Sequence, residues 1–443
     1  MSRLALTLAL AAALSCASPA APAPSRPNIL LFLADDLGYG DLGCYGAPDV
    51  RTPHLDRLAA EGVRFTQFYS NGPECTPTRT ALLTGRYQHR VGGLECAIGT
   101  GNVGRYDDAI RLAERQELGL PTSEETIATV LRNASYETAI VGKWHLGYER
   151  KFLPDRHGFD SSFGLLGGSV DYFHHVEPDG RPTLFENGAP VREDGYMTRL
   201  IADRAVRFLR QPRGKPFFLY VPFNAPHAPY QGPNDRREKP LVPGEWDKGT
   251  REKFAGMVES MDQAIGRVRK ALEEVGKDAD TLVLFTSDNG GNARGRNMPF
   301  SGHKSSLFEG GIRVPCIARW PGVLKGGTVS PRVGITMDLT ASLARFAEAR
   351  PSRPLDGRDL FGPETPDRTL FWRARRGAVT WKAVRAGDIK YLFRKDGERV
   401  EEHVFDLATD PGEKKDLISD RAADKDRLKA LLVRWEAEVR HSR

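Results

Sequence analysis

The sequence has few cysteines, and their spacing argues against a disulfide framework. Its 443 residues contain five cysteines, an odd number at irregular spacing. Small scaffolds held together by disulfides have a denser and even set, so this class is excluded. If Cys16 is removed or lipidated and Cys75 has a special role, at most one bridge remains for Cys44, Cys96 and Cys316, and we do not predict it.

The sequence also lacks long apolar runs and blocks of one charge. After the N-terminal segment, no stretch approaches the ~18 uninterrupted apolar residues of a membrane-spanning helix. Lys and Arg (64) are interspersed with Asp and Glu (58), for a formal net charge of +6. We therefore predict no transmembrane span and no nucleic-acid face. The excess of basic over acidic residues is compatible with an anionic substrate but does not identify one.

The N-terminal segment has the pattern of an export signal. Arg3 precedes an apolar run that ends in small residues, and the run is too short to span a membrane. Cys16 follows Ala-Leu-Ser, an imperfect match to a bacterial lipoprotein cleavage site, and precedes an Ala/Pro/Ser linker. A lipid anchor at Cys16 and ordinary cleavage nearby both stay open. We expect residues 1–26 to be signal and linker, and the protein to be periplasmic, secreted or an outer-membrane lipoprotein.

Strand and helix patterns alternate along most of the chain and predict an α/β domain over residues 27–350. Continuous apolar runs are typical of central strands covered on both faces. They occur at Asn28–Ala34, Thr138–Val141, Phe217–Phe223, Thr281–Thr286 and Val314–Arg319. Helical patterns occur between them at Pro53–Glu61, Ser123–Asn133, Met197–Gln211, Thr250–Val275 and Thr336–Glu348.

The composition changes after about residue 350. A stretch rich in Pro and Arg, residues 350–358, has the character of a linker. Short amphipathic strands are expected at Thr369–Arg373, Ala378–Arg385 and Lys390–Arg394, and a charged helix at Arg421–Arg440. Residues 351–443 are therefore predicted to form a small α+β subdomain with an antiparallel sheet and one helix.

Polar residues follow the predicted strands at the point where each strand ends. Asp35 and Asp36 come after the first, and Asp288 and Asn289 follow Thr281–Thr286. Because the carboxyl ends of parallel strands form the ligand site of open α/β sheets, we expect these side chains to converge. Their oxygens suit Ca²⁺ or Mg²⁺. Each element also has a plain alternative, a polar strand end, a helix cap or a turn, and the combination is what favours a site.

Two further strands are followed by basic side chains. Lys143 and His145 come after the strand at Thr138–Val141, and His227 lies four residues beyond Phe217–Phe223. Taken alone, Lys143 is an ordinary solvated charge and His227 a structural histidine between prolines. Their position at the same predicted sheet edge adds cations to the carboxylate cluster.

Cys75 opens the stretch CTPTRTALLTGR. Thr78–Thr84 is expected to be helical, with Pro77 in its first turn and Gly85 as its C-terminal stop. Cys75 then lies at a helix N-terminus, where an unmodified thiol is expected to have a lowered pKa and to be a candidate nucleophile. Arg79 lies one turn further on. The alternative is a small residue in a tight turn.

These residues resemble the type I, formylglycine-dependent sulfatases, an arylsulfatase-like family of the alkaline phosphatase superfamily. The signature Cys-x-Pro-x-Arg is followed by ALLTGR, and Thr78 stands where serine is commoner. Further blocks occur in the family's order between residues 27 and 418: ADDLGYGDLGCYG, GKWHLG, APHAP, SDNGG, GHKSSLFEGGIRVP and FDLATDPGEKKDL. The resemblance implies a large mixed, mostly parallel sheet sandwiched by helices.

The resemblance also implies the chemistry. Cys75 would be oxidised to formylglycine by a maturation enzyme, and its hydrate would attack the sulfur of a sulfate ester. Ca²⁺ would be bound by Asp35, Asp36, Asp288, Asn289 and residue 75. Arg79 and Lys143 would hold the hydrate, Lys304 and His227 would contact the sulfate, and His227 would also be the acid for the leaving alcohol. His145 would take a proton from the second hydroxyl of the hydrate. Ser169 would match a further active-site serine of the family, although its alignment is loose.

The substrate is not defined by these motifs. A sulfated small molecule or glycan is expected, and export favours a sulfated polysaccharide. Two loop-rich, irregular regions, residues 87–120 and 170–196, could line a pocket through His89, Arg105, Asp171, His174, His175 and Arg181. Two alternatives stay open: a phosphatase or phosphonate monoester hydrolase of the same superfamily, and an inactive protein that binds sulfated glycans. A redox thiol protein is excluded because no second cysteine lies within a few residues of Cys75.

Overall fold

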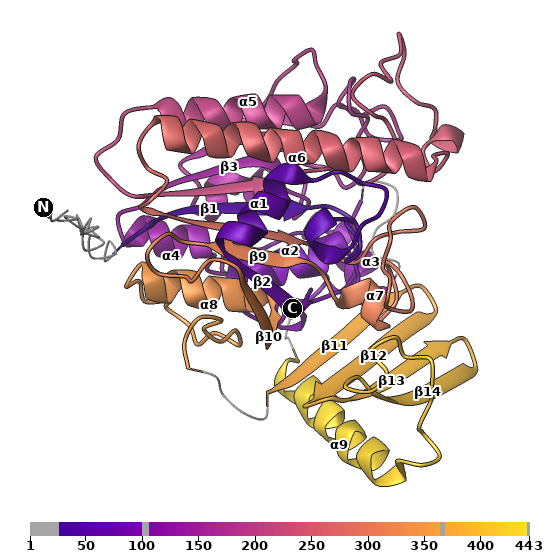
Figure 1. Cartoon of the computed structure of the whole chain (residues 1–443). Helices are drawn as coiled ribbons and strands as arrows, with labels where there is room; N and C mark the ends of the chain where they lie inside the picture. The colour runs from indigo at the N-terminus through magenta and orange to yellow at the C-terminus, as the bar shows by residue number, and fades with distance from the viewer. Residues whose placement is uncertain (1–25, 100–105, 364–367, 441–443) are drawn as a thin grey trace, which may run out of the picture.

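The computed structural model describes residues 26–99, 106–363 and 368–440. A large sheet lies between layers of helices, and a smaller sheet with one helix packs at one side of it (Figure 1). The predicted signal peptide with Cys16, and also Arg105, lie outside the described residues. Within the described part, no helix has both the length and the apolar character needed to cross a bilayer. Cys44, Cys75, Cys96 and Cys316 form no disulfide with one another.

The large sheet is mixed and mostly parallel, as predicted. Its order is β10-β2-β9-β8-β1-β7-β3-β4-β5-β6. Parallel pairing joins β8, β1, β7, β3 and β4, and joins β10 to β2, whereas β9, β5 and β6 run antiparallel to their neighbours. The strands are β1 (Asn28–Ala34), β2 (Val63–Tyr69), β3 (Glu137–Lys143), β4 (Ser161–Leu165), β5 (Leu184–Glu186), β6 (Ala189–Pro190), β7 (Phe217–Pro222), β8 (Thr281–Ser287), β9 (Cys316–Arg319) and β10 (Thr328–Ile335).

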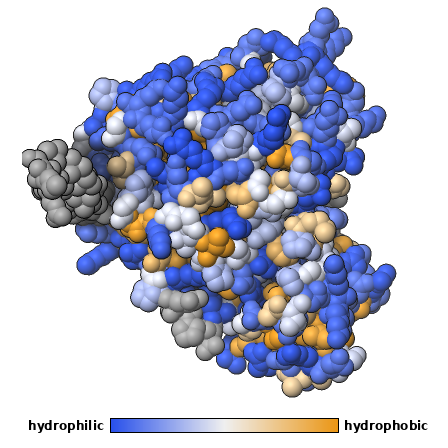
Figure 2. Space-filling model, viewed as in Figure 1, coloured by the Kyte–Doolittle hydropathy of each residue, from blue (hydrophilic) through white to orange (hydrophobic). Residues whose placement is uncertain are grey.

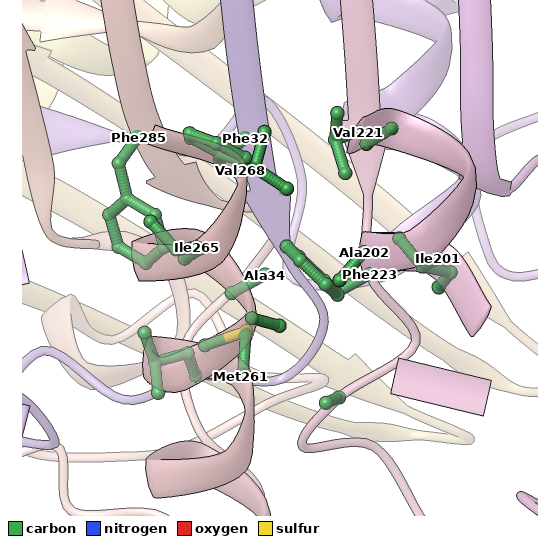
Figure 3. Close-up of a cluster of buried hydrophobic side chains, with 14 of the residues drawn as sticks. Phe32, Ala34, Ile201, Ala202, Val221, Phe223, Met261, Ile265, Val268 and Phe285 are labelled. Atoms are coloured by element: carbon green, nitrogen blue, oxygen red, sulfur yellow. The ribbon is translucent and has the colours of Figure 1, made fainter. Parts of the chain in front are cut away.

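The helices cover both faces of this sheet. On one face, α5 and α6 pack on the central strands, and Figure 3 shows their apolar side chains meeting Phe32, Val221 and Phe285. On the other face, α2, α4 and α8 contact one another and pack on the sheet. The helices are α1 (Pro53–Glu61), α2 (Cys75–Thr84), α3 (Asp107–Glu114), α4 (Ile127–Asn133), α5 (Met197–Arg210), α6 (Arg251–Glu274), α7 (Glu309–Ile312), α8 (Thr336–Phe346) and α9 (Ala422–Glu438).

The C-terminal part is an antiparallel sheet with one helix, as expected. Its strands follow chain order and are β11 (Thr369–Arg376), β12 (Val379–Ala386), β13 (Ile389–Asp396) and β14 (Arg399–Asp406). Tight turns join them, and each turn has a glycine with positive φ, such as Gly377 at +60°. The apolar face of the sheet packs against α9, which buries Leu428, Leu432 and Trp435.

The structure adds elements that the sequence patterns did not predict. They are β2, β4, β5, β6, β10, β14 and α7, together with α3 inside the region expected to be irregular. The run at Val314–Arg319 does form a buried strand, β9, but it is antiparallel to β8 and β2. Continuous hydrophobicity reports burial on both faces and carries no information on strand direction. For this reason β9 does not end at the same sheet edge as β1 and β8.

Candidate active site

Cys75 is the first residue of α2 and lies among buried charges. Glu74 precedes the helix in an extended conformation, and Gly85 ends the helix with φ +67°, as predicted. The Cys75 Sγ atom donates to Asp35 Oδ1 at 3.2 Å. Two ammonium groups also lie near this sulfur, Lys143 Nζ at 3.6 Å and Lys304 Nζ at 3.7 Å. Residue 75 is therefore the point where three separate segments meet.

The environment of Cys75 does not favour a thiolate. Burial, together with the negative charge of Asp35, raises the pKa of the thiol well above its ordinary value, and the two lysines do not compensate. The expectation of a lowered thiol pKa is therefore wrong, because burial outweighs the helix N-terminus. An unmodified Cys75 would be a neutral thiol and a poor nucleophile.

Asp35 and Asp36 extend from the end of β1 into the site. Lys143, the last residue of β3, places its Nζ 2.5 Å from Asp35 Oδ2. Burial alone would raise the pKa of Asp35, but the positive charges of Lys143, His227 and Arg79 outweigh it and hold the pKa well below its usual range. Asp36 has φ +67°, a conformation that a non-glycine residue adopts only under constraint and that is common at functional sites.

Asp288 and Asn289 follow β8, which neighbours β1 in parallel register. Arg79 donates to Asp288 Oδ2 from Nε at 3.0 Å and from Nη2 at 2.8 Å, and its Nη1 donates to the Lys143 carbonyl at 2.9 Å. Arg79 therefore braces the sheet edge beneath the site, and none of these three hydrogen bonds goes to Cys75 Sγ. Burial and the nearby charge of Asp35 raise the pKa of Asp288 to about 7 despite the arginine.

The donor set fits a hard divalent cation. Ligand atoms of Asp35, Asp36, Cys75 and His227 all lie within 4.8 Å of one another. Asn289 Oδ1 is buried and lacks a hydrogen-bond partner within the described part of the chain, and such a carbonyl-type oxygen is a typical Ca²⁺ ligand. Closely spaced buried carboxylates repel one another unless a cation lies between them. The carboxylate and amide oxygens are thus arranged to hold Ca²⁺ or Mg²⁺, and His227 lies beside them.

His227 and Lys304 approach Asp36 from the open side. His227 Nε2 lies 3.6 Å from Asp36 Oδ2, and Lys304 Nζ lies 2.7 Å from Asp36 Oδ1. Burial lowers the pKa of His227, and the charge of Lys304 lowers it further. Lys304 keeps its charge, because the carboxylates around it raise its pKa in spite of burial.

His145 follows Lys143 by two residues and has φ +57°. Its Nε2 lies 2.5 Å from the Ile98 carbonyl oxygen, and its Nδ1 is buried without a partner in the described residues. Burial and the charge of Lys143 lower the pKa of His145 well below its ordinary value, so the ring is neutral. A neutral imidazole has the capacity to accept a proton.

A cavity of about 480 Å³ opens onto these residues. Its lining includes Cys75, His145, His227, Lys304 and Ser169, which places the loosely aligned serine at the same cavity. Further polar residues of the lining were not named as candidates from the sequence: Tyr148, Glu177, Asp179, Ser305 and Arg376. Tyr148 donates to Glu177 at 2.8 Å. Three signals pointed towards four of them: Tyr148 directly follows the GKWHLG block, Ser305 lies inside the GHKSSLFEGGIRVP block, and Glu177 and Asp179 lie in the region 170–196 that was expected to line a pocket.

Several loop residues named as candidate pocket residues have structural roles instead. Asp171 accepts backbone hydrogen bonds from Phe173, His174 and Leu241, which folds its own loop. His89 is buried and contacts the Arg373 carbonyl at 2.9 Å. None of the candidates His89, Asp171, His174, His175 and Arg181 lines the cavity as the structure describes it.

The fold and the polar sheet edge define an α/β enzyme with an alkaline phosphatase-like architecture. A family model described as Sulfatase matches residues 27–349. The chain is 36% identical over 402 residues to N-acetylgalactosamine-6-sulfatase of Canis lupus familiaris, covering 84% of this chain and 73% of that protein. It is 36% identical over 476 residues to arylsulfatase A of Bos taurus, covering 93% and 86%. The chain therefore belongs to the sulfatase family and is a sulfatase, a sulfuric ester hydrolase.

Solved structures agree with this assignment. The structure of Ps i-CgsB in complex with k-i-k-neocarrahexaose matches with a TM-score of 0.79 and 29% identity, covering 93% of each chain. The match extends over both the large sheet and the C-terminal sheet, since a shorter overlap could not reach this coverage. The predicted fold class is thus confirmed.

Proposed function

We propose that Cys75 is converted to formylglycine and that the protein uses it, with bound Ca²⁺, to hydrolyse sulfate esters of carbohydrates. The observation that carries this proposal is the position of Cys75 Sγ, which is within 3.7 Å of Asp35, Lys143 and Lys304. A neutral buried thiol has no evident use at such a position, whereas a modified side chain bearing hydroxyls does. The aldehyde hydrate would supply a nucleophilic hydroxyl, and Ca²⁺ would supply charge for the sulfate oxygens.

Two lysines would bind the substrate and orient the side chain of residue 75. Lys304 is accessible from the cavity and would bind the sulfate group, together with His227. Lys143 is fully buried and would orient the side chain of residue 75. Fixed cations near a developing negative charge lower the barrier most when they are buried, because little reorganisation is needed.

Two histidines, His145 and His227, would transfer protons during the reaction. His227 reaches the cavity, and its Nδ1 lies 2.6 Å from the Ala228 carbonyl, which leaves Nε2 to face the substrate. The negative charge of a bound sulfate ester would favour the protonated ring, and Nε2 would then donate its proton to the leaving alcohol. His145 would hold a proton at its neutral ring during the second half of the reaction. General acid–base catalysis of this kind contributes about 10²–10⁴-fold to the rate.

A carbohydrate substrate is supported by the relatives and by the cavity. One relative was solved with k-i-k-neocarrahexaose, and another is named N-acetylgalactosamine-6-sulfatase. The cavity lining includes polar side chains that would face sugar hydroxyls, namely Ser169, Tyr148, Glu177 and Asp179. Export from a bacterial cell, with or without a lipid at Cys16, remains part of the proposal.

Peptide mass spectrometry across residue 75 tests the proposal. The protein should be made with a formylglycine-generating enzyme, and the peptide mass should correspond to the aldehyde or its hydrate. The matured protein should release sulfate from sulfated oligosaccharides, and Cys75→Ala should release none while unfolding at the same temperature. An intact thiol in active protein would overturn the mechanism. Faster turnover of phosphate monoesters than of sulfate esters would favour the phosphatase alternative.

A further inference from the structure

A second cavity, also of about 480 Å³, lies beside the active site. It is formed by the segment between β8 and α7 together with the start of α6. Its lining includes Arg251, Asn292, Arg294, Arg296, Met298 and His303. The cavity adjoins the active site directly, because Asn292 Nδ2 donates to Asp36 Oδ2 at 3.2 Å and His303 precedes Lys304 in the chain.

This cavity is basic. Three arginines line it, and no lining residue is acidic. Arg251 is neutralised by Asp41 and Asp49 at 2.6 and 3.0 Å, and Arg296 shares Asp49 at 3.2 Å. Arg294 is exposed and makes no ion pair with any residue that the structure describes. One guanidinium group in the cavity is therefore left for a ligand. The first cavity differs in this respect, because Glu177 and Asp179 line it.

The segment that carries Arg294 is held in a fixed shape. Asn297 accepts from the Gly291 N–H at 2.8 Å and donates back to the Gly291 carbonyl at 2.9 Å. The Arg296 N–H donates to Asp41, and its carbonyl accepts from the Gly40 N–H at 2.8 Å. A site that is already folded loses little conformational entropy when it binds a ligand.

We propose that this cavity is a second anion subsite, in which Arg294 binds the sulfate group of a neighbouring sugar while the scissile sulfate ester occupies the active site. This inference rests on the proposed function, because it assigns the enzyme a glycan that carries more than one sulfate. A guanidinium group matches sulfate through two parallel hydrogen bonds. Met298, 61% exposed at the same cavity, offers an apolar surface to the face of a sugar ring.

Direct binding of a polysulfated glycan tests the subsite. The probe is a fluorescently labelled dextran sulfate oligosaccharide, titrated at two salt concentrations against Arg294→Gln, Arg294→Lys and the matched control Arg434→Gln. Arg434 is an exposed arginine of α9, in the C-terminal part of the chain. We expect a 5- to 10-fold weaker Kd and a shallower salt dependence for Arg294→Gln, a smaller loss for Arg294→Lys, and less than a 2-fold change for the control.

Catalysis of a small substrate separates this inference from the proposed function. The KM and kcat of Arg294→Gln for 4-nitrophenyl sulfate should stay within 2-fold of the unaltered enzyme, because that substrate does not extend beyond the first cavity. The inference is overturned if Arg294→Gln and Arg434→Gln bind dextran sulfate equally, or if unsulfated dextran shows the same dependence on Arg294. Loss of the proposed function would appear instead as absent sulfate release from a protein whose dextran sulfate binding still depends on Arg294.

Discussion

Arg376, at the end of β11, holds Glu74, the residue immediately before Cys75. Two charge-assisted hydrogen bonds join them, from Nε to Oε1 at 2.9 Å and from Nη2 to Oε2 at 2.8 Å. The buried Glu74 carboxylate also accepts from Ser305 Oγ at 3.0 Å and from the Ala97 N–H at 2.7 Å. One carboxylate therefore joins the C-terminal sheet to the segments that carry Cys75 and its neighbouring lysine.

Two more buried glutamates repeat this arrangement. Glu95 accepts from Arg373 at 2.7 Å and from Arg375 at 2.8 Å, and Glu309 accepts from Lys390 at 2.9 Å. Each glutamate lies within five residues of an active-site group: Glu95 precedes Ile98, and Glu309 follows Lys304. The C-terminal sheet thus holds the segments that build the cavity, although it supplies none of the predicted site residues.

Arg376→Met should lower activity more than it lowers stability. It removes the partner of a buried carboxylate beside Cys75, and small displacements of a reacting group cost up to about 10²-fold in rate. We expect kcat/KM for a sulfate ester to fall by roughly that amount, with the peptide at residue 75 still modified. Arg399→Met, at an exposed arginine of β14, is the matched control and should leave kcat/KM unchanged. Equal kinetics for the two variants would remove Arg376 as a positioning residue.

Calcium removal should destabilise the protein. A cation that binds only the folded state stabilises it, by about 2.7 kcal/mol at a concentration 100 times its Kd. Treatment with a chelator should therefore lower the melting temperature, and added Ca²⁺ should restore it. Asp36→Ala should abolish this response and the bound metal measured by elemental analysis, whereas Asp426→Ala, at an exposed aspartate of α9, should keep both. A melting temperature that changes neither with the chelator nor with added Ca²⁺ would contradict a metal site at Asp36.

The sequence could predict the strand ends of the site, because the strands concerned are buried on both faces. Continuous apolar runs end where polar residues begin, so Asp35 and Asp288 are visible as the first charged residues after β1 and β8. The helix at Cys75 was predictable from Pro77 and Gly85, although it begins three residues earlier than expected.

The rest of the cavity was not predictable, because its residues come from distant parts of the chain. Arg376 is 302 residues away from its partner Glu74, and no local pattern connects the two. Glu177 and Asp179 lie in the region 170–196, which was expected to line a pocket, but nothing in the sequence distinguishes them from the other charged residues of that loop. Half-buried strands such as β10 were also not predicted. Their mixed burial gives neither a continuous run of apolar residues nor a regular alternation of apolar and polar residues.

Lys390→Met should destabilise the fold strongly. Lys390 is fully buried and lies 2.9 Å from Glu309 and 2.8 Å from Glu413, both of which are also buried. Its removal leaves carboxylates buried without this cation, and breaking such a buried ion pair costs about 3–5 kcal/mol. Lys395→Met, at an exposed lysine of the same strand, should change the free energy of unfolding by less than about 0.5 kcal/mol. Denaturant titration of both variants measures the difference, and a cost for Lys390→Met no larger than the control would contradict the role of this cluster.

Stability should fall as the solution becomes acidic, partly because of His157. The ring is buried against Trp144, and burial lowers its pKa to about 4, against an ordinary value near 6.5. Between these two values the unfolded chain binds a proton that the folded chain does not. The contribution of His157 to the free energy of unfolding is therefore fully present above pH 6.5. It declines by up to about 1.4 kcal/mol per pH unit as the pH falls towards 4. His89, whose pKa burial also lowers to about 4, contributes in the same direction.

The contribution of His157 can be isolated with His157→Phe, which keeps a ring against Trp144 and removes the titrating group. Chemical unfolding measured at pH 7.5 and at pH 4.5 should show a smaller loss of stability for this variant than for the unaltered protein. Val433→Phe, at an exposed valine of α9 that has no titratable group, should leave the pH dependence unchanged. An acid sensitivity that is the same in all three proteins would mean that His157 is protonated in the folded state, and the burial argument for its lowered pKa would then be wrong. Because both variants are compared at the same two pH values, any general effect of adding a phenylalanine cancels in the difference.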